Sequence, residues 1–210
     1  MTTAATAALE ARAINAWRGD RHVLRDLSFA VSSGECCKVT GPNGIGKTTL
    51  LRVLCGFMTP ETGEALWRGR PVTRLGPDYA VDLAYLGHAN ALKTDLTARE
   101  NLRYLVGVRR PVTPTEIDDV LERVGIFDCA DLPVRVMSAG QRRRLSLARL
   151  WLWPAVVWIL DEPATNLDAA GLALVESMIG DHLARDGLAV VAAHQRLLDA
   201  DRRVRPLELV

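Results

Sequence analysis

A glycine-rich segment followed by Lys and Thr has the residue types and spacing of a phosphate-binding site. Residues 41–48 fit the pattern G-x-x-x-x-G-K-[ST] and lie between a predicted strand over 35–40 and a predicted helix over 48–55. Its glycines let backbone N–H groups turn toward phosphate oxygens, and the positive end of the helix attracts anions. In this pattern the Lys reaches the β- and γ-phosphates and the Thr hydroxyl ligates Mg²⁺. The sequence therefore predicts a nucleoside triphosphate site formed by Gly41, Pro42, Asn43, Gly44, Ile45, Gly46, Lys47, Thr48 and Thr49.

Two carboxylates follow an apolar stretch, 157–160, that has the length of a buried strand. Ligands of open α/β sheets bind at the carboxyl ends of the strands. Asp161 is therefore expected to hold Mg²⁺, partly through water, and Glu162 to polarise the water that attacks the γ-phosphate. An isolated apolar run ending in Asp-Glu is more often a strand end with solvated charges. Its combination with the glycine-rich segment favours the catalytic interpretation.

Composition limits the partners but names none. The 210 residues suit one domain, and 26 Lys+Arg against 25 Asp+Glu give no global field for nucleic acid or an acidic membrane surface, so such a partner would need a local patch. No nucleic-acid partner is expected. Cysteines 36, 37, 55 and 129 lack C-x-x-C spacing, and we expect them to be reduced and mostly buried. The first twelve residues lack a secretory pattern, and the longest uncharged run, 150–160, is too short to span a bilayer. We therefore expect a cytoplasmic chain.

The hydrophobic periodicity predicts an α/β fold with a mainly parallel core sheet. Continuous apolar runs at 156–160 and 188–193 are typical of parallel strands buried on both faces. Residues 24–40 predict two strands joined by a hairpin at the Ser-Ser-Gly turn, and 63–85 predict a small antiparallel β subdomain. Helical periodicity from 97 to 152 predicts an inserted helical subdomain. We expect one nucleotide-binding domain over 1–210, with its core at 1–86 and 155–210 and the helical subdomain at 87–154.

Residues 137–141, Met-Ser-Ala-Gly-Gln, distinguish among the many folds that carry the first two motifs. Here the chain resembles the ATP-binding cassette family, whose signature is usually Leu-Ser-Gly-Gly-Gln. Ser138 and the backbone at Gly140 would form a second anion site at a helix N-terminus. The resemblance implies that this site, with Gln141, closes over the γ-phosphate bound by a second copy. A homodimer that hydrolyses ATP, with Mg²⁺ as cofactor, is therefore expected.

Further family motifs follow in the usual order. Residues 164–168 match the segment called the D-loop, with Asp168 in its characteristic place, and His194 matches the histidine that contacts the γ-phosphate. His88 stands where most relatives have a glutamine that contacts Mg²⁺ and water, and this departure puts that contact in doubt. Family members often stack adenine on an aromatic residue before the first strand. Trp17 is the candidate, with Arg18 or Arg21 as alternatives and with ordinary packing of Trp17 about equally favoured.

The stretch 86–102 is similar to one subfamily, the ATP-binding subunits of bacterial haem exporters used in cytochrome c maturation. That subfamily shares Gly-His, Leu-Lys-Thr and Leu-Thr-x-x-Glu-Asn-Leu, the Ser-Ala-Gly-Gln variant, the arginines at 142–144 and the sequence at 148–152. The resemblance implies a peripheral protein at the cytoplasmic face of the inner membrane, docked near 88–102 on integral membrane subunits. ATP hydrolysis would then energise haem export or release of a haem chaperone.

Haem itself is not expected to bind this chain, because the histidines at 22, 88, 182 and 194 include no Cys-x-x-Cys-His. Three alternatives to the haem exporter remain open. Another transporter of the family would share every core motif. A soluble cassette clamp on nucleic acid or the ribosome would usually contain two cassettes or a long coiled coil. A small-molecule kinase would share the glycine-rich segment but not the 138–141 motif.

Overall fold

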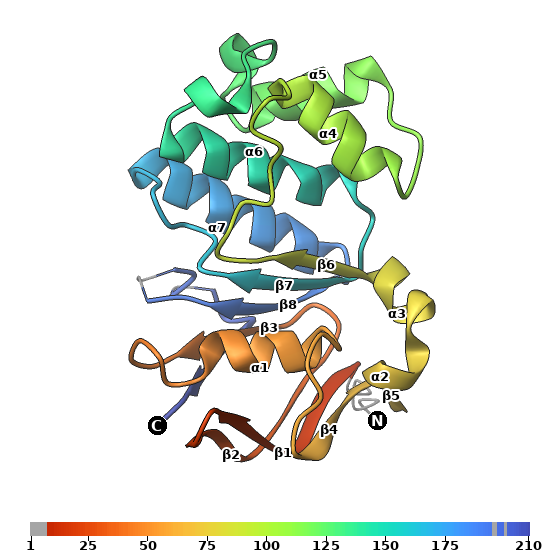
Figure 1. The fold of residues 1–210 in the computed structure, drawn as a ribbon, viewed down its shortest axis with the longest axis vertical. Helices are drawn as coiled ribbons and strands as arrows, with labels where there is room; N and C mark the ends of the chain where they lie inside the picture. Colours follow the sequence, from red (N-terminus) through yellow and green to blue (C-terminus); the bar gives the residue numbers. More distant parts are fainter. Residues whose placement is uncertain (1–7, 195–196, 200) are drawn as a thin grey trace. The chain divides into compact units, whose positions relative to one another are not determined.

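The computed structural model describes residues 8–194, 197–199 and 201–210 and divides the chain into two compact units (Figure 1). The core unit lies within Met1–Tyr85, Ala155–Glu162 and Ile179–Val210, and the helical unit comprises Leu86–Pro154 and Pro163–Met178. The parallel sheet, the antiparallel sheet and the helices of the predicted α/β fold are all present. The domain limits expected from the sequence remain a prediction. No helix among the described residues is long and apolar enough to cross a membrane.

A five-stranded sheet carries the core unit, in the order β6-β7-β8-β3-β9. The strands are β3 (Cys36–Thr40), β6 (Leu83–Leu86), β7 (Val157–Asp161), β8 (Leu188–Ala192) and β9 (Val204–Glu208). β3 pairs in parallel with β8 and β9, and β7 pairs in parallel with β8. Every residue of β7 and β8 is buried, as continuous apolar runs require. The two predicted buried strands are therefore confirmed.

An antiparallel sheet forms the second layer of the core unit, in the order β2-β1-β4-β5. Its strands are β1 (Leu9–Arg18), β2 (Arg21–Val31), β4 (Thr62–Trp67) and β5 (Arg70–Pro71), and short helices α2 (Val72–Leu75) and α3 (Pro77–Asp82) follow. Helix α1 (Lys47–Leu54) contacts β4 as well as β7 and β8, so it lies between the two sheets (Figure 1). One apolar cluster fills this space.

The hairpin predicted for residues 24–40 is wrong, although both strands exist. β2 pairs with β1, whereas β3 pairs with β8 and β9 in the other sheet. The turn between them is bound to a distant part of the chain, because the Gly34 N–H donates to the Gly187 carbonyl oxygen at 2.8 Å. Local apolar patterns fix that a strand forms but not which strand it pairs with.

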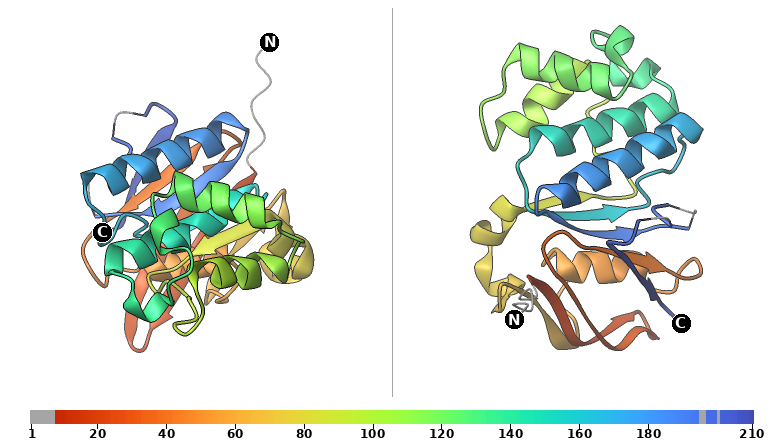
Figure 2. Two further views of the ribbon diagram at one scale, coloured as in Figure 1. Left: turned by 90° about the horizontal axis from the view of Figure 1, so that it is seen from above. Right: turned by 180° about the vertical axis from the view of Figure 1, so that it is seen from behind.

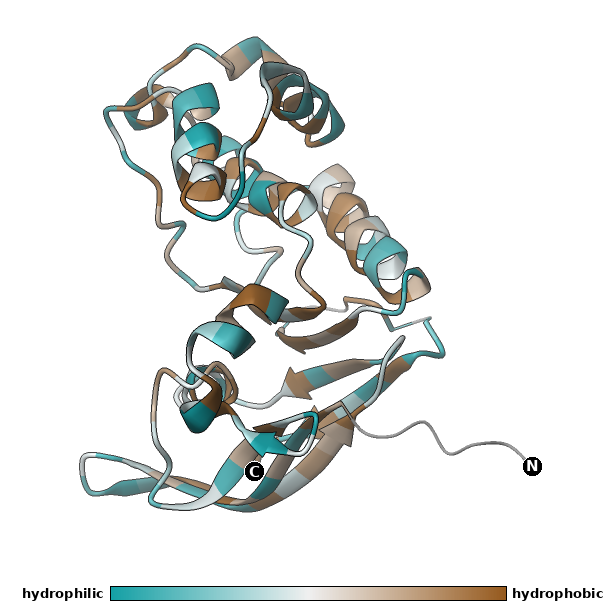
Figure 3. Cartoon of the chain, turned by 90° about the vertical axis from the view of Figure 1, so that its right-hand side faces the viewer, coloured by the Kyte–Doolittle hydropathy of each residue, from teal (hydrophilic) through white to brown (hydrophobic). Residues whose placement is uncertain are grey.

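The helical unit contains α4 (Ala98–Gly107), α5 (Pro114–Arg123), α6 (Ala139–Leu152) and the first part of α7 (Ala169–Ala184). Two short 3-10 helices, Phe127–Cys129 and Val134–Val136, connect α5 to α6. Helices α4, α5 and α6 contact one another around a separate apolar cluster (Figure 2). Hydrophilic and hydrophobic residues alternate along these helices (Figure 3), as expected for helices with one buried face.

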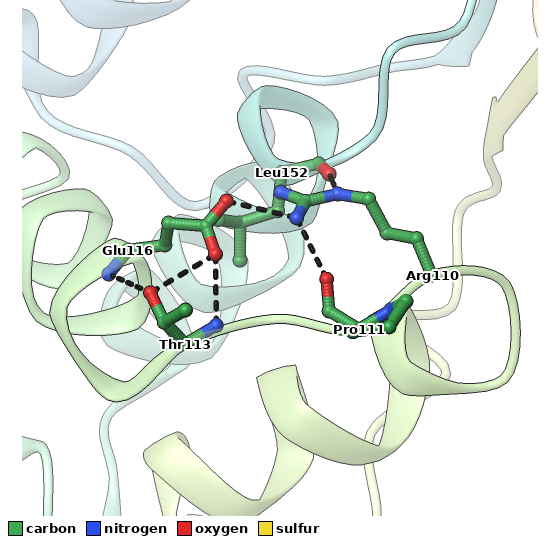
Figure 4. Close-up of polar contacts among 5 residues, drawn as sticks. All are labelled: Arg110, Pro111, Thr113, Glu116 and Leu152. Carbon is green, nitrogen blue, oxygen red and sulfur yellow. Dashed lines mark hydrogen bonds and ion pairs between the residues drawn. The ribbon is translucent and has the colours of Figure 1, made fainter.

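Arg110 joins the ends of three helices in the helical unit (Figure 4). Its Nε donates to the Leu152 carbonyl oxygen at 2.8 Å, and its Nη1 donates to the Pro111 carbonyl oxygen at 2.8 Å. Nη1 also lies 2.8 Å from Oε1 of Glu116. Glu116 in turn accepts from Thr113 and completes the capping box of α5. Arg110 thus satisfies a carbonyl at the C-terminal end of α6 that the helix itself leaves unpaired.

The environment of His182 makes the stability of the core unit depend on pH. Its ring stacks on Trp158 at a centroid distance of 3.9 Å, and Nε2 lies 3.1 Å from the Leu188 carbonyl oxygen. Burial lowers the pKa of His182 to about 4, against the hydrogen bonds to Leu188 and Val156 that raise it. Below pH 6.5, His182 is therefore protonated in the unfolded chain but stays neutral in the folded chain until the pH approaches 4. Stability is expected to fall between about pH 6.5 and pH 4, by on the order of 3 kcal/mol.

The measurement is thermal unfolding at pH 7.5 and at pH 5.5, above the range where most carboxylates titrate. His182→Gln should lower the melting temperature at both pH values but should shrink the difference between them. His22→Gln is the control, because it removes another histidine of the same unit. An undiminished pH difference in His182→Gln would contradict the prediction.

Candidate functional site

The glycine-rich loop connects β3 to α1, and backbone from other segments approaches it closely at both ends. At Gly41, φ is 137° and an added Cβ would lie 2.7 Å from the Leu209 carbonyl oxygen. At Gly46, φ is 132° and a Cβ would lie 2.8 Å from the Val23 carbonyl oxygen. Both glycines are therefore required by backbone conformation and by close backbone approach. The loop of residues 41–46 can adopt this path only with glycine at these two positions.

The N-terminus of α1 differs from those of α4, α5 and α6. Each of those three helices begins with a complete capping box, whereas α1 has Gly46 at its N-cap, no side-chain cap and no acidic residue in its first turn. Free N–H groups and the positive end of a helix attract anions. The first turn of α1, with Thr48 and Thr49, is therefore left open to an external anion such as phosphate.

Lys47 is the charged side chain at this helix end, and it is only 6% exposed. Its Nζ donates to the carbonyl oxygens of Gly41 at 2.8 Å and Pro42 at 3.1 Å, and lies 2.8 Å from His194 Nε2. Burial lowers the pKa of Lys47, while the charges of Glu162 and Asp161 raise it. The ammonium group is thus folded back onto its own loop, close to both acidic residues.

Thr48 and Asp161 place two kinds of oxygen next to each other. Thr48 Oγ1 donates to Asp161 Oδ2 at 2.8 Å, and Asp161 is buried at the end of β7. Hydroxyl and carboxylate oxygens are the ligand types that Mg²⁺ prefers, usually together with water and substrate phosphates. Among the described residues, no group of three or more His, Cys, Asp and Glu side chains is arranged so that it could hold a metal ion by itself. The pair therefore fits an ion whose remaining ligands are water and phosphate.

Glu162 follows Asp161 and has a left-handed backbone, with φ of 49°. Its N–H donates to the Ala192 carbonyl oxygen of the neighbouring strand β8 at 2.8 Å. A non-glycine residue in this region is uncommon and is often found at functional sites. The turn separates the two carboxylates, so that Asp161 stays with Thr48 while Glu162 Oε1 lies 2.9 Å from His194 Nε2.

His194 has two partners for a single ring nitrogen. Nε2 lies 2.8 Å from Lys47 Nζ and 2.9 Å from Glu162 Oε1. A ring nitrogen carries either one proton or one lone pair, so it can donate to Glu162 or accept from Lys47 but not both. The structure thus brings Lys47, Thr48, Asp161, Glu162 and His194 together at one edge of the core sheet. The side chain of His194 is exposed.

Trp17 lies on the antiparallel sheet and is 45% exposed. One face of its ring is covered by His22, with ring centroids 4.4 Å apart and planes 4° apart. His22 Nε2 lies 3.1 Å from Asn15 Oδ1. A base could therefore stack only on the other face of the indole. Arg21 lies close to the loop, because a Cβ on Gly44 would be 4.0 Å from its Nη1.

In the helical unit, Ser138 is the N-cap of α6. Its Oγ accepts from the Gln141 N–H at 3.1 Å, and Gln141 Oε1 accepts from the Ser138 N–H at 2.8 Å. Gln141 Nε2 also donates to Cys129 Sγ at 3.1 Å. The Ser138 hydroxyl still has a proton to donate. Ala139 is the first residue of α6 and so has helical, negative φ, the condition under which Ala in place of the usual Gly costs little.

The segment that leads to Asp168 passes close to the first turns of α6, which contain Gly140 and Arg144. A Cβ on Gly140 would lie 3.1 Å from the Asn166 carbonyl oxygen. Asp168 Oδ1 accepts from the Gly171 N–H at 2.8 Å and from Arg144 Nη2 at 3.0 Å. The Gly171 hydrogen bond, more than the charge of Arg144, lowers the pKa of Asp168. Asp168 is therefore held as a carboxylate at the beginning of α7.

His88 is exposed in the helical unit, and the segment that contains it is fixed by residues that the motifs did not identify. The fully buried Asn101 accepts from the Lys93 N–H and donates to the carbonyl oxygens of Lys93, Leu96 and Thr97. Arg143, whose guanidinium is buried, donates to Gly87 and Asn90. The sequence signal for this is a polar residue on the apolar face of a predicted helix, which is rarely buried unless it forms hydrogen bonds. Asn101 and Arg143 both fit that description.

Comparisons with known proteins agree with these features. A model of the ABC transporter family matches residues 24–165. A Cupriavidus metallidurans protein named cytochrome c biogenesis ATP-binding export protein CcmA 2 is 44% identical over 194 residues, which cover 92% of each chain. Proteins named CcmA from Salmonella typhi and Nitrosomonas europaea are 42% identical over 201 and 206 residues, with at least 95% of each chain covered.

Solved structures are similar as well. A Pyrococcus furiosus protein assigned to the ABC transporter ATP-binding proteins superposes with a TM-score of 0.83, 26% identity and 96% coverage of both chains. The cbiO1 protein of Clostridium perfringens superposes with a TM-score of 0.73 at 24% identity, covering 90% of this chain and 79% of that one. The similarity to cbiO1 shows a shared fold only.

Proposed function

The chain belongs to the ABC transporter family, and we propose that it is the ATP-hydrolysing subunit of a haem export system used in cytochrome c biogenesis. As a family member it binds ATP and couples its hydrolysis to transport. The observation that carries the proposal is the arrangement of Lys47, Thr48, Asp161, Glu162 and His194 in a chain 42–44% identical to cytochrome c biogenesis ATP-binding export proteins.

In the proposed binding step, the triphosphate occupies the uncapped N-terminus of α1. Backbone N–H groups of residues 41–49 donate to phosphate oxygens. Lys47 Nζ exchanges the carbonyl oxygens of Gly41 and Pro42 for the β- and γ-phosphates, which carry full charge. This exchange gives the buried ammonium group a charged partner. Trp17 presents to the adenine the ring face that His22 does not cover.

In the proposed hydrolysis step, the oxygen of a water molecule attacks the γ-phosphorus and the bond to the β–γ bridging oxygen breaks, giving ADP and phosphate. Glu162 accepts the proton of the attacking water. His194 turns Nε2 to a γ-phosphate oxygen, and its contacts with Lys47 and Glu162 keep the ring close to both groups beforehand. Charge stabilisation by Lys47 supports the transfer.

A magnesium ion is part of the proposal. Thr48 Oγ1 and Asp161 Oδ2 supply its protein ligands, directly or through water, and His88 is the candidate for the place usually held by glutamine. An ion held there would neutralise phosphate charge. The hydroxyl oxygen of Thr48 and the carboxylate oxygen of Asp161 lie 2.8 Å apart, and this proximity supports the assignment of both as ligands.

A second copy of the chain completes each site in this proposal. Ser138 donates its hydroxyl proton to the γ-phosphate held by the partner's loop, and the backbone at Gly140 adds an N–H group. Gln141 supports Ser138 through the capping box, and Asp168 belongs to the same contact surface. Two complete sites then form only in a homodimer.

The proposed location is the cytoplasmic face of the bacterial inner membrane, where integral membrane subunits bind the segment near residues 88–102. Haem passes through those subunits or is transferred to a chaperone that ATP hydrolysis releases. This chain binds neither haem nor nucleic acid directly. The similarity to export proteins of cytochrome c biogenesis over at least 92% of the chain supports the proposal.

Membrane association tests the proposal. Expressed alone, the chain should remain in the supernatant after ultracentrifugation. Coexpressed with the integral membrane subunits of its haem export system, it should pellet with membranes and copurify with those subunits in detergent. Copurification with unrelated membrane subunits would indicate another transporter, and sedimentation with ribosomes or DNA would indicate a soluble clamp.

A further inference from the structure

Arg143 lies in the second turn of α6 and is only 2% exposed. Its Nε donates to the Pro163 carbonyl oxygen at 3.0 Å. Its Nη1 donates to the Gly87 carbonyl oxygen at 3.1 Å and to Asn90 Oδ1 at 3.1 Å. All of these residues belong to the helical unit. A buried guanidinium is costly unless its donors are paired, so this position is specified by the three acceptors.

The acceptors lie next to residues with assigned roles. Pro163 directly follows Glu162, and Gly87 directly precedes His88. Proline has a fixed φ and no N–H, so the carbonyl oxygen is the one backbone hydrogen-bonding group that it can offer. Arg143 uses that group. One side chain thus holds the backbone adjoining the proposed general base and the backbone adjoining the residue at the glutamine position.

A second residue on the same face of α6 strengthens the link to the His88 segment. Ser146 is fully buried, and its Oγ donates to the Asn90 carbonyl oxygen at 2.8 Å. Residues three apart on a helix lie on one face, so Arg143 and Ser146 hold Asn90 from the same side. Helix α6 itself begins at Ser138. Two segments that adjoin residues with proposed roles, at Pro163 and at Gly87 to Asn90, are therefore fixed to the helix that begins at Ser138.

We propose that Arg143 is a positioning residue for ATP hydrolysis. Its planar guanidinium keeps the segment after Glu162 and the segment before His88 in fixed register with the helix that begins at Ser138. Lysine cannot replace it, because an ammonium group lacks the planar, forked donors that reach three acceptors. The inference rests on the proposed role of Glu162. Arg143 does not touch the nucleotide, so its loss affects turnover and not binding.

The experiment compares Arg143→Lys with Arg110→Lys in the full-length chain. Arg110 is a matched control, since it is an arginine of the same unit that also donates to two carbonyl oxygens and contacts a side-chain oxygen (Figure 4). We measure kcat and KM for ATP, affinity for a fluorescent ATP analogue, and melting temperature. Arg143→Lys should lower kcat about tenfold or more, with analogue affinity and KM within twofold of wild type. Arg110→Lys should lower the melting temperature but leave kcat unchanged.

A purely structural role predicts a different result. In that case both variants lose melting temperature, and kcat per folded molecule is unchanged in each, which overturns the inference. If Arg143→Lys does not fold, Asn90→Ala removes one acceptor and retains Arg143 and its bond to Pro163. A severalfold loss of kcat in Asn90→Ala, with unchanged analogue affinity, supports the inference, and wild-type kcat overturns it.

Failure of this inference is distinguishable from failure of the proposed function. If Glu162→Gln is inactive and Arg143→Lys has wild-type kcat, only the positioning role is lost. If Glu162→Gln hydrolyses ATP at the wild-type rate, the proposed base is wrong, whatever Arg143→Lys does.

Discussion

Glu162→Gln is expected to lower steady-state ATP hydrolysis by a factor of about 10² to 10⁴. The amide is isosteric with the carboxylate but cannot accept a proton from the attacking water. Nucleotide affinity should be retained, because Lys47, Thr48 and the backbone of the loop are unchanged. The variant should therefore accumulate with ATP bound. Phosphate release measures hydrolysis, and titration with a fluorescent analogue measures affinity.

The same variant tests the pairing of two copies. With ATP and Mg²⁺ it should elute from a sizing column as a dimer, because the closed state is not consumed. Adding Ser138→Arg should restore the monomer while keeping analogue affinity, since the long cation displaces the hydroxyl that reaches the partner's γ-phosphate. Glu122→Gln, an exposed glutamate of α5, is the control and should behave as wild type in both assays. A Glu162→Gln protein that stays monomeric with ATP would contradict the dimer.

Lys47→Ala is expected to weaken ATP binding by about 10- to 100-fold, as the loss of charge-assisted hydrogen bonds to phosphate implies. The ammonium group contacts His194 and the carbonyl oxygens of Gly41 and Pro42, and it must leave these two oxygens to reach the phosphates. Part of the effect therefore arises from a loop that has lost its internal bonds. The fluorescence titration checks the affinity, and the melting temperature checks the loop.

Lys93→Ala is the matched control for charge, because Lys93 is exposed in the helical unit and lies outside the glycine-rich segment. It should bind the analogue as tightly as wild type. Lys47→Arg keeps the charge but adds bulk at a nearly buried position, so it should restore little of the affinity. Equal affinity in Lys47→Ala and wild type would remove Lys47 from the binding site.

Features determined by short segments could be predicted from the sequence. Short segments specify the glycine-rich loop, the helix after it and the carboxylates at the end of β7. The structure brings Thr48 and Asp161 together, with the charge of Lys47 close to Asp161. The family resemblance added Ser138, Asp168 and His194 by position. The structure places His194 beside Lys47 and Glu162 of its own chain. The roles of Ser138 and Asp168 at a shared site remain predictions, because they depend on a second copy of the chain.

Features determined by distant segments could not be predicted. Apolar periodicity gave β2 and β3 as strands but could not show that they belong to different sheets. The arginines at 142–144 look alike in the sequence, yet Arg143 is buried against Gly87 and Pro163 while Arg144 binds Asp168. Asn101 likewise fixes the backbone around Lys93 and Thr97 through bonds that have no periodic signature. Burial decides these roles, and burial is a property of the folded chain.

The order of strands in the core sheet has a consequence for synthesis of the protein. β3, which leads into the phosphate-binding loop, lies between β8 and β9, and neither exists until translation has passed residue 188. A nascent chain that already contains Lys47 therefore exposes both edges of β3 and has no rigid base for the loop. Such distant pairing slows folding and leaves open strand edges at risk of aggregation. Ribosome-bound fragments that end before β8 should therefore not hydrolyse ATP, and they should require chaperones to remain soluble.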